Sequence, residues 1–174
     1  MSHPVFEVPQ ITQDYAEVKH ILYDSVIETW AQKVLELGSD VGDSTRIFAT
    51  ALRETGGHLW TVDVLPPKWY PEIMEPYKNI TIITEDTEKF QTDELFDLLF
   101  IDDHNDETKI YSHVLGELLQ FGPQIKKGGR ILIHDVIHPR FGDGSRKAIG
   151  EWCWQNKLSW TIERRTHGLG IIQL

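Results

Sequence analysis

Short apolar runs alternate with longer stretches of helical periodicity along most of the chain. Helical spacing of apolar residues predicts helices over residues 11–30 (in one or two pieces), 43–54, 69–77, 107–125 and 142–154, the last after a short loop. Apolar and β-branched runs predict strands over residues 34–37, 58–63, 80–84, 96–102 and 130–136. Two more strands, over residues 158–163 and 168–174, close the chain as a hairpin. Residues 1–10 show little periodicity and are expected to form an arm or loop.

This order of elements indicates the fold class. Strands that alternate with helices favour a parallel sheet with helices on both of its faces. The closing pair of strands is a hairpin, so the last strand should run antiparallel to the rest. We therefore expect an α/β fold built on a seven-stranded, mostly parallel sheet.

Residues 34–45 pass from a strand through two glycines into a helix. Gly38 and Gly42 allow the backbone to approach a ligand, and free N–H groups at the helix N-terminus would point at it. Asp43 or Ser44 is the expected helix cap. A strand that turns through glycines into a helix N-terminus is a geometry that binds nucleotides.

The spacing of these glycines excludes two common phosphate-binding patterns. It is G-x-x-x-G, which differs from the G-x-G-x-x-G of dinucleotide sites and from the G-x-x-x-x-G-K-[ST] of phosphate loops. No lysine follows to bind a phosphate, and Glu36 and Asp40 would repel one. The stretch favours a ligand that is not strongly anionic and that can carry a positive charge.

An acidic residue followed by G-x-x-x-G after the first strand resembles the first motif of class I S-adenosylmethionine-dependent methyltransferases. Asp63 ends the second predicted strand, where α/β nucleotide folds place the carboxylate that accepts both ribose hydroxyls. In this family an acidic or amide group after the third strand meets the adenine amino group, and here Asp86 has that position. Ordinary turn and capping roles are the alternative for these residues.

The resemblance covers residues 33–174 and implies a Rossmann-like sheet. It places residues 1–32 as an arm and helix that cover the cofactor or substrate site. The expected cofactor-binding residues are Glu36, Gly38, Ser39, Gly42, Ser44, Asp63, Val64, Asp86 and Asp102.

Polar residues end the fourth and fifth predicted strands, which should be neighbours in the sheet. Asp102, His134 and Asp135 would then meet beside the cofactor, and two carboxylates with an imidazole can hold a divalent metal. These strand ends look like those of small methyltransferases related to catechol O-methyltransferase and to macrolide-sugar and cephalosporin-tailoring enzymes. The resemblance implies the same three residues as ligands of Mg²⁺ or another divalent ion, although relatives more often have a carboxylate at position 134. The lysine base of the catechol-type enzymes is replaced by Asn105, so His104 is the candidate general base, with Asp102 as its catalytic partner. Helix caps, a core histidine and a loop histidine are the alternatives.

Composition narrows the choice of partners and compartment. The chain has 174 residues, enough for one domain with a good core, and a formal net charge of −10. This acidity disfavours nucleic acid and anionic membranes as partners. The single cysteine, the absence of a long apolar run and an N-terminus unlike a signal peptide favour a cytoplasmic protein. Substrate recognition would rely on residues 1–30, the loop over residues 137–145, or another subunit of a homo-oligomer.

The resemblance implies methyl transfer from S-adenosylmethionine to an oxygen of a small-molecule acceptor, with or without a divalent metal. Two other classes stay open. One is a different α/β nucleotide-cofactor enzyme, such as an oxidoreductase, which the missing G-x-G-x-x-G disfavours. The other is a binding module that keeps the fold without catalysis. A methyltransferase acting on nucleic acid or protein is disfavoured by the acidic charge.

Overall fold

The structure is a computed structural model that describes residues 11–65, 76–103, 106–141 and 143–174. Its helices are α1 (Gln13–Ala16), α2 (Lys19–Thr29), α3 (Asp43–Thr55), α4 (Ile110–Phe121), the 3₁₀ helix η2 (Gly122–Gln124) and α5 (Gly144–Asn156). Its strands are β1 (Lys33–Leu37), β2 (His58–Asp63), β3 (Ile80–Thr84), β4 (Phe96–Ile101), β5 (Ile125–Ile133), β6 (Trp160–Glu163) and β7 (Leu169–Gln173).

The strands form a seven-stranded sheet in the order β3-β2-β1-β4-β5-β7-β6. All neighbours from β3 to β5 pair in parallel, and β7 pairs antiparallel with both β5 and β6. β1 and β4 lie side by side at the centre, and the chain reverses direction across the sheet between them. Ligands of open α/β sheets bind outside the carboxyl ends of the strands at such a reversal.

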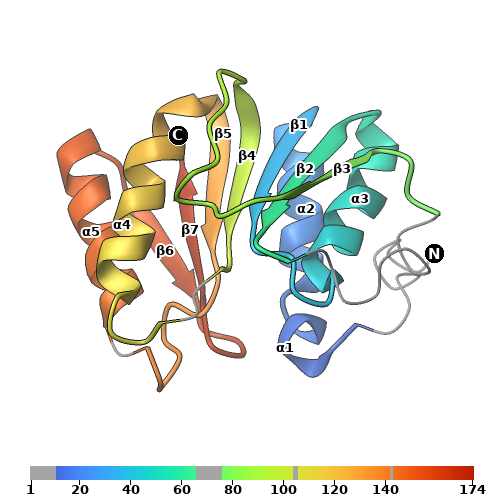
Figure 1. Ribbon diagram of the computed structural model, residues 1–174. Helices are drawn as coiled ribbons and strands as arrows, with labels where there is room; N and C mark the ends of the chain where they lie inside the picture. The colour runs from blue at the N-terminus through green and yellow to red at the C-terminus, as the bar shows by residue number, and fades with distance from the viewer. Residues whose placement is uncertain (1–10, 66–75, 104–105, 142) are drawn as a thin grey trace.

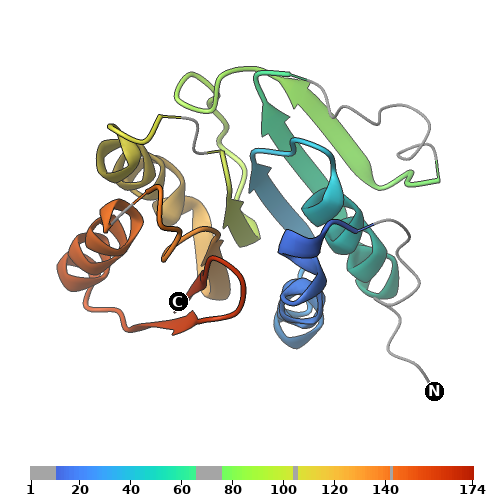
Figure 2. The same ribbon diagram turned by 90° about the horizontal axis from the view of Figure 1, so that it is seen from below.

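Helices cover both faces of the sheet (Figure 1). The first helices, α1 to α3, lie on one face, and α4 and α5 lie on the other, as the view in Figure 2 also shows. Alternate residues of β4 enter two separate cores, because successive side chains of a strand point to opposite faces. Leu98 and Phe100 pack with α2 and α3, whereas Leu99 and Ile101 pack with α4 and α5. Burial on both faces explains the continuous apolar run of this strand.

The predicted α/β fold class is confirmed, including the parallel pairing and the antiparallel last strand. The helix predicted over residues 11–30 is two helices, α1 and α2. The short helix predicted over residues 69–77 falls almost wholly on residues outside those described, and so does the arm predicted for residues 1–10.

Three local predictions were wrong. The helix predicted over residues 107–125 ends at Phe121, and η2 then leads directly into β5. Gly128 and Gly129 lie inside β5, where its pairing with β4 is irregular and Gly128 adopts φ +87°, rather than in a turn before the strand. The N-cap of α3 is Gly42 at φ +80°, because the left-handed backbone there favours glycine over the predicted Asp43 or Ser44.

No helix in the described part of the chain is both long and apolar enough to cross a membrane.

Candidate functional site

The carboxyl ends of β1, β4 and β5 are held level by main-chain hydrogen bonds. The Asp102 N–H donates to the Leu37 carbonyl (2.8 Å), and the His134 N–H donates to the Ile101 carbonyl (3.0 Å). Gly38 therefore lies against the backbone of Asp102: a Cβ at position 38 would stand 2.4 Å from the Asp102 carbonyl oxygen. The structure brings the glycine turn and the predicted metal ligands to the same edge of the sheet.

Asp63, at the end of β2, organises the turn that follows β1. Its Oδ2 accepts hydrogen bonds from the N–H groups of Ser39 (2.8 Å) and Asp40 (3.1 Å) and from the Ser39 hydroxyl (3.1 Å). Oδ1 accepts one from the Leu65 N–H (3.1 Å). The N–H groups of Ser39 and Asp40, which lie in the glycine turn before α3, are thus turned toward Asp63. The carboxylate has a structural role whether or not it also contacts a ribose.

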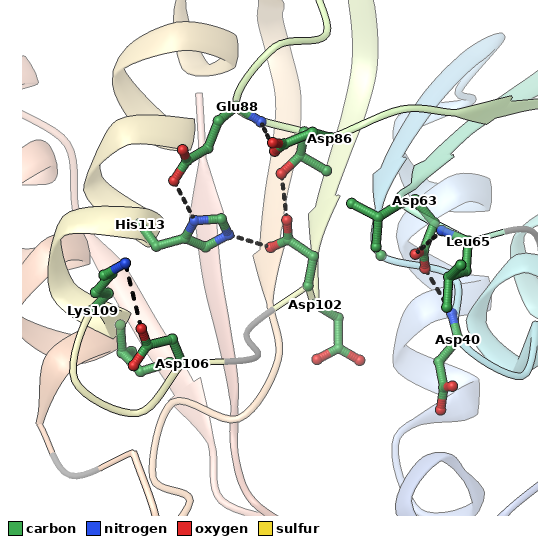
Figure 3. A pocket seen from close by; sticks show the side chains of 14 residues that line it. Asp40, Asp63, Leu65, Asp86, Glu88, Asp102, Asp106, Lys109 and His113 are labelled. Carbon is green, nitrogen blue, oxygen red and sulfur yellow. Dashed lines mark hydrogen bonds and ion pairs between the residues drawn. The ribbon is translucent and has the colours of Figure 1, made fainter.

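A cavity of about 480 Å³ opens beside this turn (Figure 3). Its volume lies within the usual range for small-molecule sites. Seven carboxyl groups, one lysine and one histidine line it in the described part of the chain, so its charge favours a cationic ligand. The lining residues are Gly38, Asp40, Asp63, Val64, Leu65, Asp86, Thr87, Glu88, Asp102, Asp103, Asp106, Lys109, Ile110 and His113.

Five of the nine predicted cofactor-binding residues line this cavity. They are Gly38, Asp63, Val64, Asp86 and Asp102. The other four, Glu36, Ser39, Gly42 and Ser44, are not among its lining residues, and their contact with a cofactor stays a prediction. The predicted base, His104, lies outside the described residues.

Glu36 is fully buried behind the glycine turn. It points toward α3, where the Thr45 hydroxyl donates to its Oε2 (2.6 Å). Burial raises the pKa of the Glu36 carboxyl from 4.5 to about 7, although hydrogen bonds from neighbouring hydroxyls oppose the shift. The carboxyl group therefore keeps its proton to a higher pH than an exposed glutamate would.

Glu36→Gln should therefore change how stability depends on pH. The folded chain keeps a proton on Glu36 that the unfolded chain loses above about pH 4.5. The contribution of this group to the free energy of unfolding is therefore fully present below that pH. It falls by up to about 3 kcal/mol as the pH rises through 7. Glutamine has no such loss, so the variant should gain on the natural chain between about pH 5 and about pH 8 in urea unfolding. Parallel stability profiles would contradict the expectation.

The three predicted metal ligands converge. His134 Nδ1 lies 3.4 Å from Asp102 Oδ1 and 3.2 Å from Asp135 Oδ1, so one donor atom of each residue could reach a shared ion. His134 is buried, and the ring of Tyr15 stacks on it with centroids 5.0 Å apart. The Tyr15 hydroxyl donates to Asp102 Oδ2, which leaves Oδ1 facing His134. The donor set fits a divalent ion, and Asp135 also forms a second such group with His138 and His167.

Tyr15 and Thr12 attach the segment around α1 to the site. The Thr12 N–H donates to Asp43 Oδ2 (2.7 Å), and Asp43 forms an ion pair with Arg46 in which both side chains are almost fully buried. Arg46 also donates from Nε to the Gly42 carbonyl (3.1 Å). No sequence signal marked this pair, because an arginine in an amphipathic helix is ordinarily exposed. The pair fixes the first turn of α3, and through Thr12 it fixes the segment that lies over the strand ends.

One family model, described as a methyltransferase domain, matches residues 35–136 of the chain. The match runs from β1 to the residues that follow β5 and so includes every strand end of the site. The chain belongs to the methyltransferase family. No curated protein matches it in sequence.

Solved methyltransferase structures share the fold at low identity. PaMTH1 from Podospora anserina, bound to S-adenosylhomocysteine (SAH), matches with TM-score 0.66 at 16% identity, over 99% of this chain and 88% of its own. An O-methyltransferase from Bacillus cereus in complex with SAH matches with TM-score 0.67 at 16% identity, over 100% and 92%. The N-methyltransferase NodS from Bradyrhizobium japonicum, also with SAH, matches with TM-score 0.65 at 16% identity, over 98% and 91%. At this identity they show the methyltransferase fold, and they include both oxygen- and nitrogen-directed enzymes.

Proposed function

We propose that the protein transfers a methyl group from S-adenosylmethionine to an oxygen of a small-molecule acceptor. The observation that carries the proposal is the acidic cavity at the carboxyl ends of β1, β2 and β4, in a chain of the methyltransferase family. Asp63 would accept hydrogen bonds from the ribose, and Asp86 would meet the adenine. The negative lining suits a cofactor that carries a sulfonium and an ammonium group.

When bound, the cofactor supplies an activated methyl group, and the chain must do the rest. Its residues must align the acceptor, exclude water and remove the acceptor's proton. Tyr15 and the segment around α1 lie over the ends of β4 and β5, where they would shield the reacting atoms. We propose His104 as the base and Asp102 as the residue that orients it. Asp102, His134 and Asp135 would hold a divalent metal, which would lower the pKa of a chelated hydroxyl.

Calorimetric titration of the purified chain with S-adenosylmethionine tests the cofactor. We expect micromolar binding that weakens at least about 100-fold in Asp63→Ala, because the substitution removes a pair of charge-assisted hydrogen bonds to the ribose worth about 3 kcal/mol. Asp97→Ala is the matched control. Asp97 Oδ2 likewise accepts two main-chain N–H groups, from Gln32 and Lys33 (both 2.9 Å), but at the other end of the sheet. Binding should survive there.

Two results would count against this proposal. Absence of binding to S-adenosylmethionine and SAH in the folded chain would exclude the cofactor. An equal loss of affinity for the cofactor in Asp63→Ala and Asp97→Ala would exclude the ribose contact. Asp63 would then have only a structural role. Radiolabelled methyl transfer to panels of hydroxyl and amine acceptors, with and without Mg²⁺ or Mn²⁺, then tests the acceptor atom. Binding without turnover on any panel would favour a non-catalytic module.

A further inference from the structure

A second group of side chains of the metal-binding type lies at the wall of the cavity. Asp103 follows β4, and His113 and Glu117 lie four residues apart on α4, where the helical repeat places them on one face. One donor atom from each lies within 4.8 Å of the other two. This group shares no residue with the group formed by Asp102, His134 and Asp135.

Glu117 is buried beside Asp103 and His113. Only 2% of it is exposed, and neither carboxyl oxygen accepts a well-aligned hydrogen bond from the described residues, although Glu117 and Asp103 are close enough to share a proton. The nearest opposite group is His113 Nε2, 3.7 Å from Oε1. Burial of a carboxyl group without full hydrogen bonding is unfavourable, so this buried carboxyl group beside a histidine and a second carboxylate is a candidate ligand of a metal cation.

The orientation of the His113 ring suits a metal ligand. Nε2 faces into the group, 2.9 Å from Asp103 Oδ1. Nδ1 faces outward to Glu88 Oε1 at 3.1 Å (Figure 3). Metal-binding histidines usually donate their other ring N–H to a carboxylate in this way. A metal ion would take the place of the proton through which Nε2 bonds to Asp103. Asp103 is held similarly, since the Thr87 hydroxyl donates to its Oδ2 (2.5 Å).

We propose that Asp103, His113 and Glu117 bind a divalent transition-metal ion such as Zn²⁺ at the wall of the cavity. One imidazole and two carboxylates match the ligands of Zn²⁺ and related ions, whereas Mg²⁺ prefers oxygen ligands and retained water. Asp103 and His113 line the cavity, so a fourth coordination position can take water from it. The ion would tie α4 to the end of β4. The inference does not depend on the proposed methyltransferase activity.

Protons occupy the same site when the metal is absent. The hydrogen bond to Asp103 raises the pKa of His113 to about 9, against the opposing effect of burial. Burial, together with the charge of Asp103, raises the pKa of Glu117 well above its usual value. The ion must displace these protons, so its apparent affinity should increase as the pH rises.

The test is calorimetric titration of the chelator-treated chain with Zn²⁺, together with the visible absorption of the Co²⁺ form. We expect a binding event, separate from any at Asp102, His134 and Asp135, that weakens at least about 100-fold in both His113→Ala and the isosteric Glu117→Gln. Glu88→Gln should weaken it about 10- to 100-fold, as is usual when the carboxylate behind a ligating histidine is removed. His138→Ala and Asp102→Asn are the matched controls. They alter the other two candidate groups and should leave this event and its Co²⁺ spectrum unchanged.

Circular dichroism of each metal-free variant establishes that it is folded. Absence of Zn²⁺ and Co²⁺ binding in the folded natural chain would overturn the proposal. So would binding that persists in both His113→Ala and Glu117→Gln, or that disappears only in Asp102→Asn or His138→Ala. Tighter binding of Mg²⁺ than of Zn²⁺ would overturn the assigned class of metal.

Discussion

Gly38→Ala is expected to lower the free energy of unfolding by about 2–5 kcal/mol and to abolish binding of the proposed cofactor. Gly38 has φ +88°, a backbone region that costs other residues about 1–2 kcal/mol. Its Cβ would also stand 2.4 Å from the Asp102 carbonyl oxygen and 2.8 Å from the Asp103 Cα. Backbone atoms cannot rotate away, so this overlap adds about 1–3 kcal/mol. Urea unfolding and calorimetry measure the two losses.

Gly128→Ala separates the two causes. Gly128 has nearly the same backbone angle, φ +87°, but a Cβ there would have no atom within 4 Å. It should therefore lose only the backbone contribution of about 1–2 kcal/mol. If both variants lose the same free energy of unfolding, the close approach of β1 to the end of β4 does not contribute, and the explanation given for Gly38 fails.

Arg46→Met is expected to lower the free energy of unfolding by about 3–5 kcal/mol, because it leaves the buried Asp43 carboxylate without its cation. Only 1% of Arg46 and 2% of Asp43 is exposed, so water cannot replace the lost partner. The variant should also loosen the segment around α1, since Asp43 accepts the Thr12 N–H. Urea unfolding measures the first effect, and hydrogen exchange at Thr12 measures the second.

The double variant Asp43→Asn with Arg46→Met is the control. Asparagine keeps an acceptor for the Thr12 N–H and removes the buried charge. The double variant should therefore recover most of the stability lost by Arg46→Met alone. A loss below about 1 kcal/mol in the single variant would show that the ion pair is effectively solvated. A double variant less stable than the single one would show that Asp43 stabilises the fold independently of Arg46.

The parts of the fold that the sequence predicted well are those whose burial follows from their own periodicity. The strands over residues 58–63 and 80–84 have the predicted bounds, and α3 differs from prediction by one residue at its end. β4 is buried on both faces, so its apolar run was unambiguous. The start of β5 was missed because its first residues follow η2 directly and its glycines form an irregularity inside the strand rather than a turn.

The site was predictable where its residues directly follow the ends of strands. Asp63, Asp102, His134 and Asp135 could be placed from strand order alone. Contacts between residues of two distant elements could not be predicted in this way. Tyr15, for example, donates to Asp102 across 87 positions of the chain. The spacing of His113 and Glu117 was visible as a helical i,i+4 pair, but nothing in the sequence indicated that Asp103 would join them.

The position of β7 between β5 and β6 has a consequence for how the sheet assembles. β6 precedes β7 in the chain yet hydrogen-bonds to the sheet only through it, in the part of the chain that the structure describes. The edge strand can therefore join the sheet only together with β7 or after it. We expect formation of this side of the sheet to be coupled, with the β6–β7 hairpin as its unit.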